Sequence, residues 1–140
     1  MKVKCIKTSF ADDLEVAQHR QNDIHADLDI SLGEHYIVCT IEVSNNDNVE
    51  YLIRDDTYYP NLYPANLFEV VDTQLPYEEW HLGKFQYPVV LEDGVVRYFY
   101  IFGSKEMATN YDVLMSIRLH EDAGLAHFAE WHELVGRQYE

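Results

Sequence analysis

Basic residues and glycines are scarce in this chain of 140 residues. It carries 10 Lys and Arg against 25 Asp and Glu, so its formal net charge is -15 at pH 7. Phosphate groups would be repelled by such a surface, which argues against direct binding to nucleic acid or to an anionic membrane. The six glycines are scattered along the chain, so it has no glycine-rich loop of the kind that cradles phosphates.

Cysteines and long apolar runs are also few. Cys5 and Cys39 are too few for a disulfide framework, and a reducing cytoplasm suits such usage. Both fall in segments that we expect to be strands. Neighbouring acids disfavour the thiolate, so we expect both thiols to be buried and inert. No run approaches the roughly 18 apolar residues of a membrane helix, and lysines stand where an export signal has its apolar segment. The sequence therefore predicts a cytoplasmic protein.

Motifs for catalysis and for metal binding are missing. There is no nucleophile elbow, dinucleotide fingerprint, EF-hand loop or His-Glu-x-x-His. His127 and His132 are five residues apart, which does not match the i, i+4 spacing of zinc ligands on a helix. We expect no catalytic residue, no metal and no cofactor. An enzyme with its site between the two halves of the chain is an alternative, which metal bound through His127 or His132 would favour.

Hydrophobic periodicity predicts an α+β protein. Apolar residues make up 47% of the chain, enough for the core of one ordinary domain. Period-two patterns and β-branched residues predict strands, while turn residues mark their ends. The predicted strands are 2–6, 28–33, 35–43, 49–54, 67–71, 87–91 and 95–102, the last two forming a hairpin through Glu92-Asp93-Gly94.

The end of the chain is predicted to be mostly helical. Ser104 is a candidate cap for a short helix over 105–110, and Asp122 for an amphipathic helix over 122–135. In between, alternate residues of 111–119 are apolar, which favours a further strand but leaves a helix open. Residues 1–72 and 73–140 form two parts, which we expect to pack as one unit because the segment between them is too short and apolar for a free linker.

Two motifs in the first part resemble the Src-homology-three (SH3) family. The pattern Leu-x-Ile-x-Leu-Gly-x-x-Tyr-x-Val at 28–38 is similar to its diverging turn and next strand, and Tyr-Pro-Ala-Asn-Leu-Phe-Glu-Val-Val at 63–71 to its helical turn and last strand. The resemblance implies a small β-barrel over 28–72, with 11–27 as the long loop after the first strand. The chain lacks the family's Leu-Tyr-Asp-Tyr and tandem Trp signatures, and Leu67 replaces a groove tyrosine. A peptide-binding adaptor remains an alternative function.

Negative charge is concentrated in residues 11–72, where 14 acids stand against two arginines. These acids flank the charge-free, tyrosine-rich segment 57–68, and tyrosine is a residue that protein interfaces favour. We predict that acids and tyrosines form a docking face for a basic protein, although a merely solvated face is the alternative reading. The candidate partner-binding residues are Asp12, Asp13, Glu15, Asp27, Asp29, Asp55, Asp56, Tyr58, Tyr59 and Tyr63.

The whole chain, small and very acidic with an α/β extension, is similar to bacterial immunity proteins, which neutralise a cognate toxin. That resemblance implies a non-catalytic inhibitor that occludes a basic partner, for example a nuclease toxin domain. A phage-type nucleic-acid mimic would differ from it in the identity of the partner.

Overall fold

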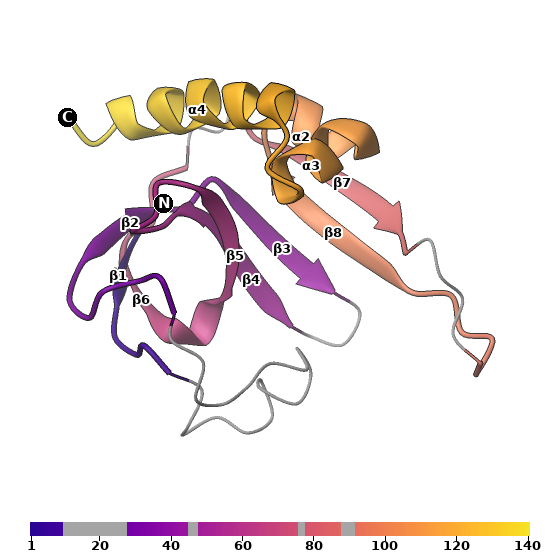
Figure 1. Ribbon diagram of the computed structural model, residues 1–140, viewed down its shortest axis with the longest axis horizontal. Coiled ribbons are helices and arrows are strands. Elements are labelled where there is room, and N and C mark those ends of the chain that lie inside the picture. The colour runs from indigo at the N-terminus through magenta and orange to yellow at the C-terminus, as the bar shows by residue number, and fades with distance from the viewer. Residues whose placement is uncertain (10–27, 45–47, 76–77, 88–91) are drawn as a thin grey trace.

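The α+β class is confirmed by the computed structural model of the chain, which describes residues 1–9, 28–44, 48–75, 78–87 and 92–140 (Figure 1). The described strands form two open antiparallel sheets and do not close into a barrel. In the part of the chain that the structure describes, no helix has the length and apolarity needed to cross a membrane.

The smaller sheet has three strands, with β1 at its centre. β1 (Lys2–Cys5) pairs with β2 (His35–Ile37) on one side and with β6 (Phe68–Asp72) on the other. The alternation of β1 is confirmed, because Val3 and Cys5 are fully buried while the two lysines are partly exposed.

The larger sheet has five strands and contains both parts of the chain. Strands β5, β4 and β3 come from the first part, and β8 and β7 from the second part extend the sheet beyond β3 (Figure 1). In sheet order the strands are β5 (Pro60–Pro64), β4 (Val49–Arg54), β3 (Thr40–Ser44), β8 (Tyr98–Gly103) and β7 (His81–Gln86).

The prediction of one continuous strand over 35–43 was wrong. The chain leaves the smaller sheet after β2 and enters the larger one at β3, and Val38 and Cys39 form the crossing. The Val38 N–H donates to the Met1 carbonyl at 3.0 Å, whereas the Cys39 N–H donates to the Leu52 carbonyl at 2.8 Å. Both side chains are fully buried, so apolar side chains alone did not reveal where the backbone changes partner.

Strand β5 was not predicted, because its sequence contains two prolines. Proline lacks the N–H that a central strand needs, so it is tolerated at an edge. Strand β5 lies at the edge of the larger sheet, with Pro60 opposite Arg54 and Pro64 opposite Glu50 of β4.

The predicted hairpin is present, but its first strand begins earlier than expected. β7 pairs with β8 from His81 opposite Gly103 to Gln86 opposite Tyr98. The predicted strand 87–91 lies mostly outside the described residues, and the Tyr87 N–H donates to the Arg97 carbonyl. Gly94 adopts a φ of 70° near the tip, as the predicted turn requires.

Residues 111–119 form a helix, so the prediction of a strand there was wrong. In α3 (Tyr111–Arg118), the Asn110 side chain caps the first turn by accepting from the backbone N–H of Asp112 and Val113. The buried residues Leu114 and Ile117 are three apart, which is helical spacing. The prediction relied on the alternation of apolar residues alone and did not consider Asn110 as a helix cap.

The other two helices are confirmed. α2 (Lys105–Thr109) is capped by Ser104, whose hydroxyl accepts from the Met107 N–H. α4 (Asp122–Arg137) is the last helix, but Glu121 and not Asp122 is its N-cap, without a side-chain bond. α4 lies across the top of both sheets in Figure 1.

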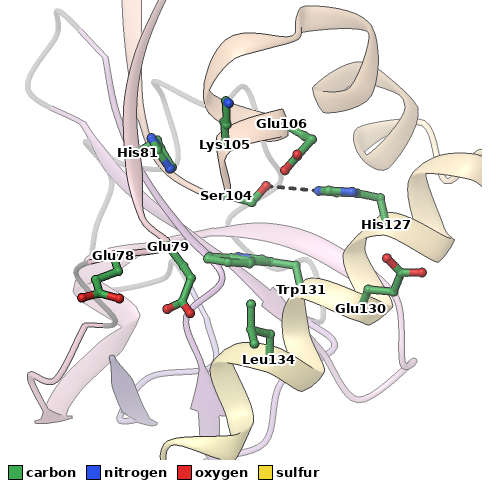
Figure 2. Close-up of a pocket in the computed structure, with 10 residues that line it drawn as sticks. All are labelled: Glu78, Glu79, His81, Ser104, Lys105, Glu106, His127, Glu130, Trp131 and Leu134. Atoms are coloured by element: carbon green, nitrogen blue, oxygen red, sulfur yellow. Dashed lines mark hydrogen bonds between the residues drawn. The ribbon is translucent and has the colours of Figure 1, made fainter.

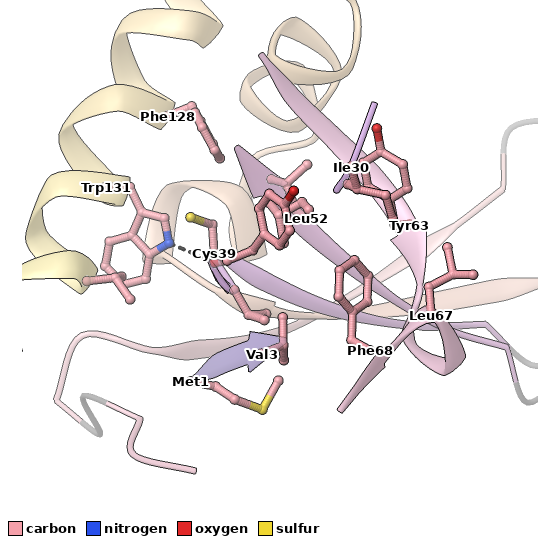
Figure 3. Packing of buried hydrophobic residues seen from close by; sticks show 14 of the residues in the cluster. Met1, Val3, Ile30, Cys39, Leu52, Tyr63, Leu67, Phe68, Phe128 and Trp131 are labelled. Atoms are coloured by element: carbon pink, nitrogen blue, oxygen red, sulfur yellow. Dashed lines mark hydrogen bonds between the residues drawn. The ribbon is translucent and has the colours of Figure 1, made fainter. Parts of the chain in front are cut away.

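The main hydrophobic core lies between the sheets and under α4 (Figure 3). Trp131 of α4 is buried, and its indole N–H donates to the Cys39 carbonyl at 2.8 Å, where the chain crosses between sheets. Phe128, one turn earlier, is 1% exposed. The core combines Val3, Leu52, Leu67 and Phe68 of the first part with Met107, Ile117, Phe128 and Trp131 of the second.

Candidate functional site

The turn between β4 and β5, residues 55–59, is organised by a buried carboxylate. Asp55 is 4% exposed, and its two oxygens accept four hydrogen bonds. Oδ1 accepts from the backbone N–H and hydroxyl of Thr57, at 2.9 and 2.5 Å. Oδ2 accepts from the Asn61 amide and the Tyr63 hydroxyl, each at 2.8 Å. These donors compensate the desolvation of the charge and fix the shape of the turn.

This turn holds Tyr58 in a conformation that tyrosine rarely adopts. Tyr58 has a φ of 67°, in the left-handed region that costs a residue with a Cβ about 1–2 kcal/mol. Its N–H donates to the Asp55 carbonyl at 2.9 Å, yet its side chain is 81% exposed. The backbone is therefore held in a strained state while the ring stands in solvent.

Tyr59 connects the turn to the helices. Its ring stacks on His120 with centroids 5.0 Å apart, and His120 Nε2 lies 2.9 Å from the Pro60 carbonyl oxygen. His120, between α3 and α4, is the second described non-glycine residue with a positive φ, at 55°. Both left-handed residues thus belong to turns joined by this stack.

Asp56 joins the turn to residues 28–34. Its carboxylate accepts from the Tyr36 hydroxyl at 2.7 Å and from the Ser31 hydroxyl at 2.6 Å, and its N–H donates to the Asp29 carbonyl. Burial, and secondarily the bond to Asp56, raises the pKa of Tyr36 to about 12. Burial and the bond to Asp55 also raise the pKa of Tyr63. Both hydroxyls therefore stay protonated and act as donors.

A cavity of about 640 Å³, here called the Arg54 pocket, opens beside this turn. The Arg54 guanidinium lies 5.9 Å from the centre of the Phe128 ring. Burial, with a smaller contribution from Arg54, lowers the pKa of His132 to about 4. The pocket is lined by Glu34, His35, Tyr36, Ile37, Arg54, Asp55, Asp56, Tyr58 and His132.

A second cavity, of about 450 Å³, lies between the start of β7, α2 and α4 (Figure 2). Ser104 Oγ and His127 Nε2 are 3.1 Å apart in it. Ser104 is 2% exposed and its oxygen already accepts the Met107 N–H, so this pair links α4 to the start of α2. The cavity is lined by Glu78, Glu79, His81, Ser104, Lys105, Glu106, His127, Glu130, Trp131 and Leu134.

One buried ion pair lies away from both cavities. Glu42 of β3 is 7% exposed and accepts a hydrogen bond from the guanidinium of Arg118 at the end of α3. Burial outweighs the attraction of Arg118 and raises the pKa of Glu42 to about 7. This pair attaches α3 to the larger sheet.

Six of the ten candidate residues from the sequence are brought together around the 55–59 turn. Asp29, Asp56, Tyr58 and Tyr59 are exposed, while Asp55 and Tyr63 are buried and bonded to each other. The other four, Asp12, Asp13, Glu15 and Asp27, lie outside the described residues. The binding role of all ten stays a prediction.

Arg54 was missed as a candidate, although the sequence contains a signal for it. It is the one Lys or Arg between Arg20 and Lys84, in a long acidic stretch. Tyr36 and His120 gave no such signal, because the contacts that make them part of the site join distant segments.

Metal ligands and reactive thiols do not mark this region. The described residues contain no group of three or more His, Cys, Asp or Glu side chains able to hold a metal ion. Cys5 and Cys39 are buried, and burial raises the pKa of both thiols, that of Cys39 to about 12.

Comparisons of the chain with protein-family models, curated proteins and solved structures found no match.

Proposed function

We propose that the protein is a non-catalytic inhibitor of the immunity type, which binds and occludes a basic protein partner such as a nuclease toxin domain. The observation that supports this best is Tyr58, an 81% exposed tyrosine on a strained turn that the buried Asp55 carboxylate organises. A backbone that is fixed before binding loses less entropy on association, and tyrosine is frequent among residues that dominate binding energies.

The charges around Tyr58 favour a basic partner. Asp29, Glu34 and Asp56 are exposed on the segments next to it, and the whole chain carries a net charge of -15. Such a field accelerates encounter with a positively charged surface and disfavours acidic competitors. The exposed tyrosine then supplies the apolar contact at the centre of the interface.

The test is affinity capture with matched tyrosine variants, followed by reconstitution. The wild-type protein, Tyr58→Gly and Tyr100→Ala are immobilised and exposed to lysate of the native cell at low salt. Tyr100 is a suitable control because it is 38% exposed on β8, in the arm formed with β7. We expect a basic protein to bind the wild type and Tyr100→Ala and to be lost with Tyr58→Gly.

The captured protein is then purified and titrated against the wild type at increasing salt. A one-to-one complex whose affinity falls as salt rises is the expected result, because screening shortens the range of charge interactions to about 8–10 Å. Equal retention by all three proteins, or binding insensitive to salt, would contradict the proposal.

We also propose that residues 1–72 form an SH3-like unit. Three features support it: the first strand pairs with the last, the chain crosses between sheets after β2, and a 3-10 turn (Ala65–Leu67) precedes β6. This arrangement is compatible with the alternative role of a peptide-binding adaptor. A library of proline-rich peptides tests that role by NMR, where the absence of chemical-shift changes would reject it.

A further inference from the structure

The Arg54 pocket contains a guanidinium that has no ion-pair partner among the described residues. Among the described residues, no carboxylate lies within ion-pair distance of Arg54, and its Nε is shielded from solvent without a hydrogen-bond partner. An arginine in a cavity normally pairs with a carboxylate, because its planar donors match two carboxylate oxygens. Arg54 instead lies against the Phe128 ring and contributes to the pocket wall.

The neighbouring acids are committed elsewhere. Asp55 accepts four hydrogen bonds and Asp56 accepts two, all from neutral donors of the protein. Glu34 is exposed at the rim. His132 is neutral at pH 7 because its pKa is lowered, so it adds no positive charge beside Arg54. The Arg54 guanidinium is therefore a charged group of the pocket wall whose Nε donor has no partner among the described residues.

The remaining walls restrict the ligand. Tyr36, Ile37 and Tyr58 supply aromatic and apolar surface, and a volume of about 640 Å³ lies in the range of small-molecule sites. Three carboxylates line the same pocket, so a doubly charged phosphate would meet more repulsion than a singly charged carboxylate. A ligand with an apolar body and one carboxylate fits both the apolar walls and the limit on negative charge.

We propose that the Arg54 pocket binds the carboxylate of a ligand with an aromatic or large apolar body, held by the Arg54 guanidinium. The carboxylate belongs either to a small organic acid or to the free C-terminus of a chain ending in an apolar residue. This site does not rest on the inhibitor role proposed above.

Four probes that share a phenyl ring test the charge of the ligand. The purified, full-length protein is titrated at pH 7 with phenylacetate, phenyl phosphate, phenethylamine and toluene, and binding is followed by two-dimensional NMR. We expect saturable binding of phenylacetate, with shifts at Ile37, Arg54 and His132 and none in the glutamate-lined cavity around Trp131. Preference for phenethylamine or phenyl phosphate, or no binding of phenylacetate, would overturn the proposal.

Substitution of Arg54 tests the anchor. Arg54→Gln should weaken phenylacetate binding about ten- to hundred-fold, the range expected for a charge-assisted hydrogen bond. Arg54→Lys keeps the charge but loses the paired donors, so an intermediate affinity is expected. The control is Arg137→Gln, an exposed arginine on α4 whose loss should leave binding unchanged. Arg54 packs on Phe128, so either variant could misfold. In that case the chemical-shift changes of the wild type on phenylacetate binding, at Ile37, Arg54 and His132, provide the test.

A pair of peptides separates the two sources of the carboxylate. A tetrapeptide ending in phenylalanine is compared with its C-terminal amide. Tighter binding of the free peptide than of phenylacetate, with loss on amidation, assigns the pocket to a chain terminus. Binding of phenylacetate without binding of the peptide assigns it to a small acid. Equal binding of the peptide and its amide would overturn recognition of the carboxylate.

The two proposals fail separately. Loss of partner capture in Tyr58→Gly concerns the protein interface, whereas phenylacetate binding depends on Arg54. A protein that binds its partner but no carboxylate retains the proposed function and loses only this site.

Discussion

The hydroxyl of Tyr63 donates a 2.8 Å hydrogen bond to the carboxylate of Asp55, and both side chains are buried at the start of the β4–β5 turn. The sequence marked these residues as candidates for an exposed interface. The structure places them beneath it, where they determine the conformation of the residues that are exposed. The strain at Tyr58 is thus supported by a satisfied buried charge, as stable strained positions require.

Removal of the Asp55 carboxylate should destabilise the fold. In Asp55→Ala, the donors of Thr57, Asn61 and Tyr63 lose their acceptor inside the protein, and we expect a loss of about 2–4 kcal/mol in unfolding free energy. Tyr63→Phe leaves the carboxylate with three bonds and should cost about 1–2 kcal/mol. Urea denaturation measures both, with Glu69→Ala, an exposed residue of β6, as a control expected within 0.5 kcal/mol of wild type. Equal stability of Asp55→Ala and the control would show that the network contributes nothing.

Replacement of Tyr58 by glycine should stabilise the protein. Glycine adopts a φ of 67° without a Cβ penalty, but it also gains entropy in the unfolded chain, so a net gain of about 0.5–1 kcal/mol is expected. Tyr58→Ala retains the penalty and loses little burial, because the side chain is 81% exposed, and should be close to neutral. Thermal and urea unfolding compare the two variants. A glycine variant less stable than the alanine variant would contradict this account of strain.

The contact between α3 and α4 should be sensitive to one methyl group. A Cβ on Gly124 would lie 2.3 Å from the backbone carbon of Ser116, so Gly124→Ala should cost about 1–3 kcal/mol. Gly136→Ala, on the same helix, is the matched control. Its Cβ would lie 3.3 Å from Ile37 Cδ1, a side-chain tip that can move, and a gain of up to about 1 kcal/mol is expected from helix propensity. Similar unfolding free energies for the two variants would refute the close contact.

The pair of Glu42 and Arg118 should make stability depend on pH. Burial raises the folded-state pKa of Glu42 from its usual 4.5 to about 7, so the folded protein binds this proton more tightly than the unfolded chain. The contribution is fully present below about pH 4.5 and is lost as pH rises towards and through 7. Relative to Glu42→Gln, the wild type should lose on the order of 1–3 kcal/mol over that interval.

The measurement is urea denaturation of both proteins at pH 5, 6, 7 and 8. The difference between them is the informative quantity, because the lowered pKa of His132 acts in the opposite direction and cancels in the comparison. Glu69→Gln serves as the control, and the difference in stability between it and the wild type should not change with pH. A difference that is constant with pH would mean that Glu42 is ionised throughout.

Local patterns in the sequence were sufficient for the α+β class and for several elements. The alternation of Lys2–Cys5 predicted a strand, the turn residues before Val49 predicted β4 as the returning strand, and Ser104 predicted the start of α2. The spacing of Phe128 and Val135 predicted α4. These features depend on neighbours within a few residues, which is the range over which side-chain periodicity and capping act.

The tertiary structure decided the features that join distant segments. Val38 and Cys39 change sheets because their N–H groups find acceptors in Met1 and Leu52, and no local pattern encodes that choice. Burial turned Asp55 from a predicted surface acid into the centre of a hydrogen-bond network, and packing left Arg54 in a pocket where no described carboxylate forms an ion pair with it. The amount of charge was fixed by composition, but which charges are buried, paired or exposed depended on contacts between residues far apart in the chain.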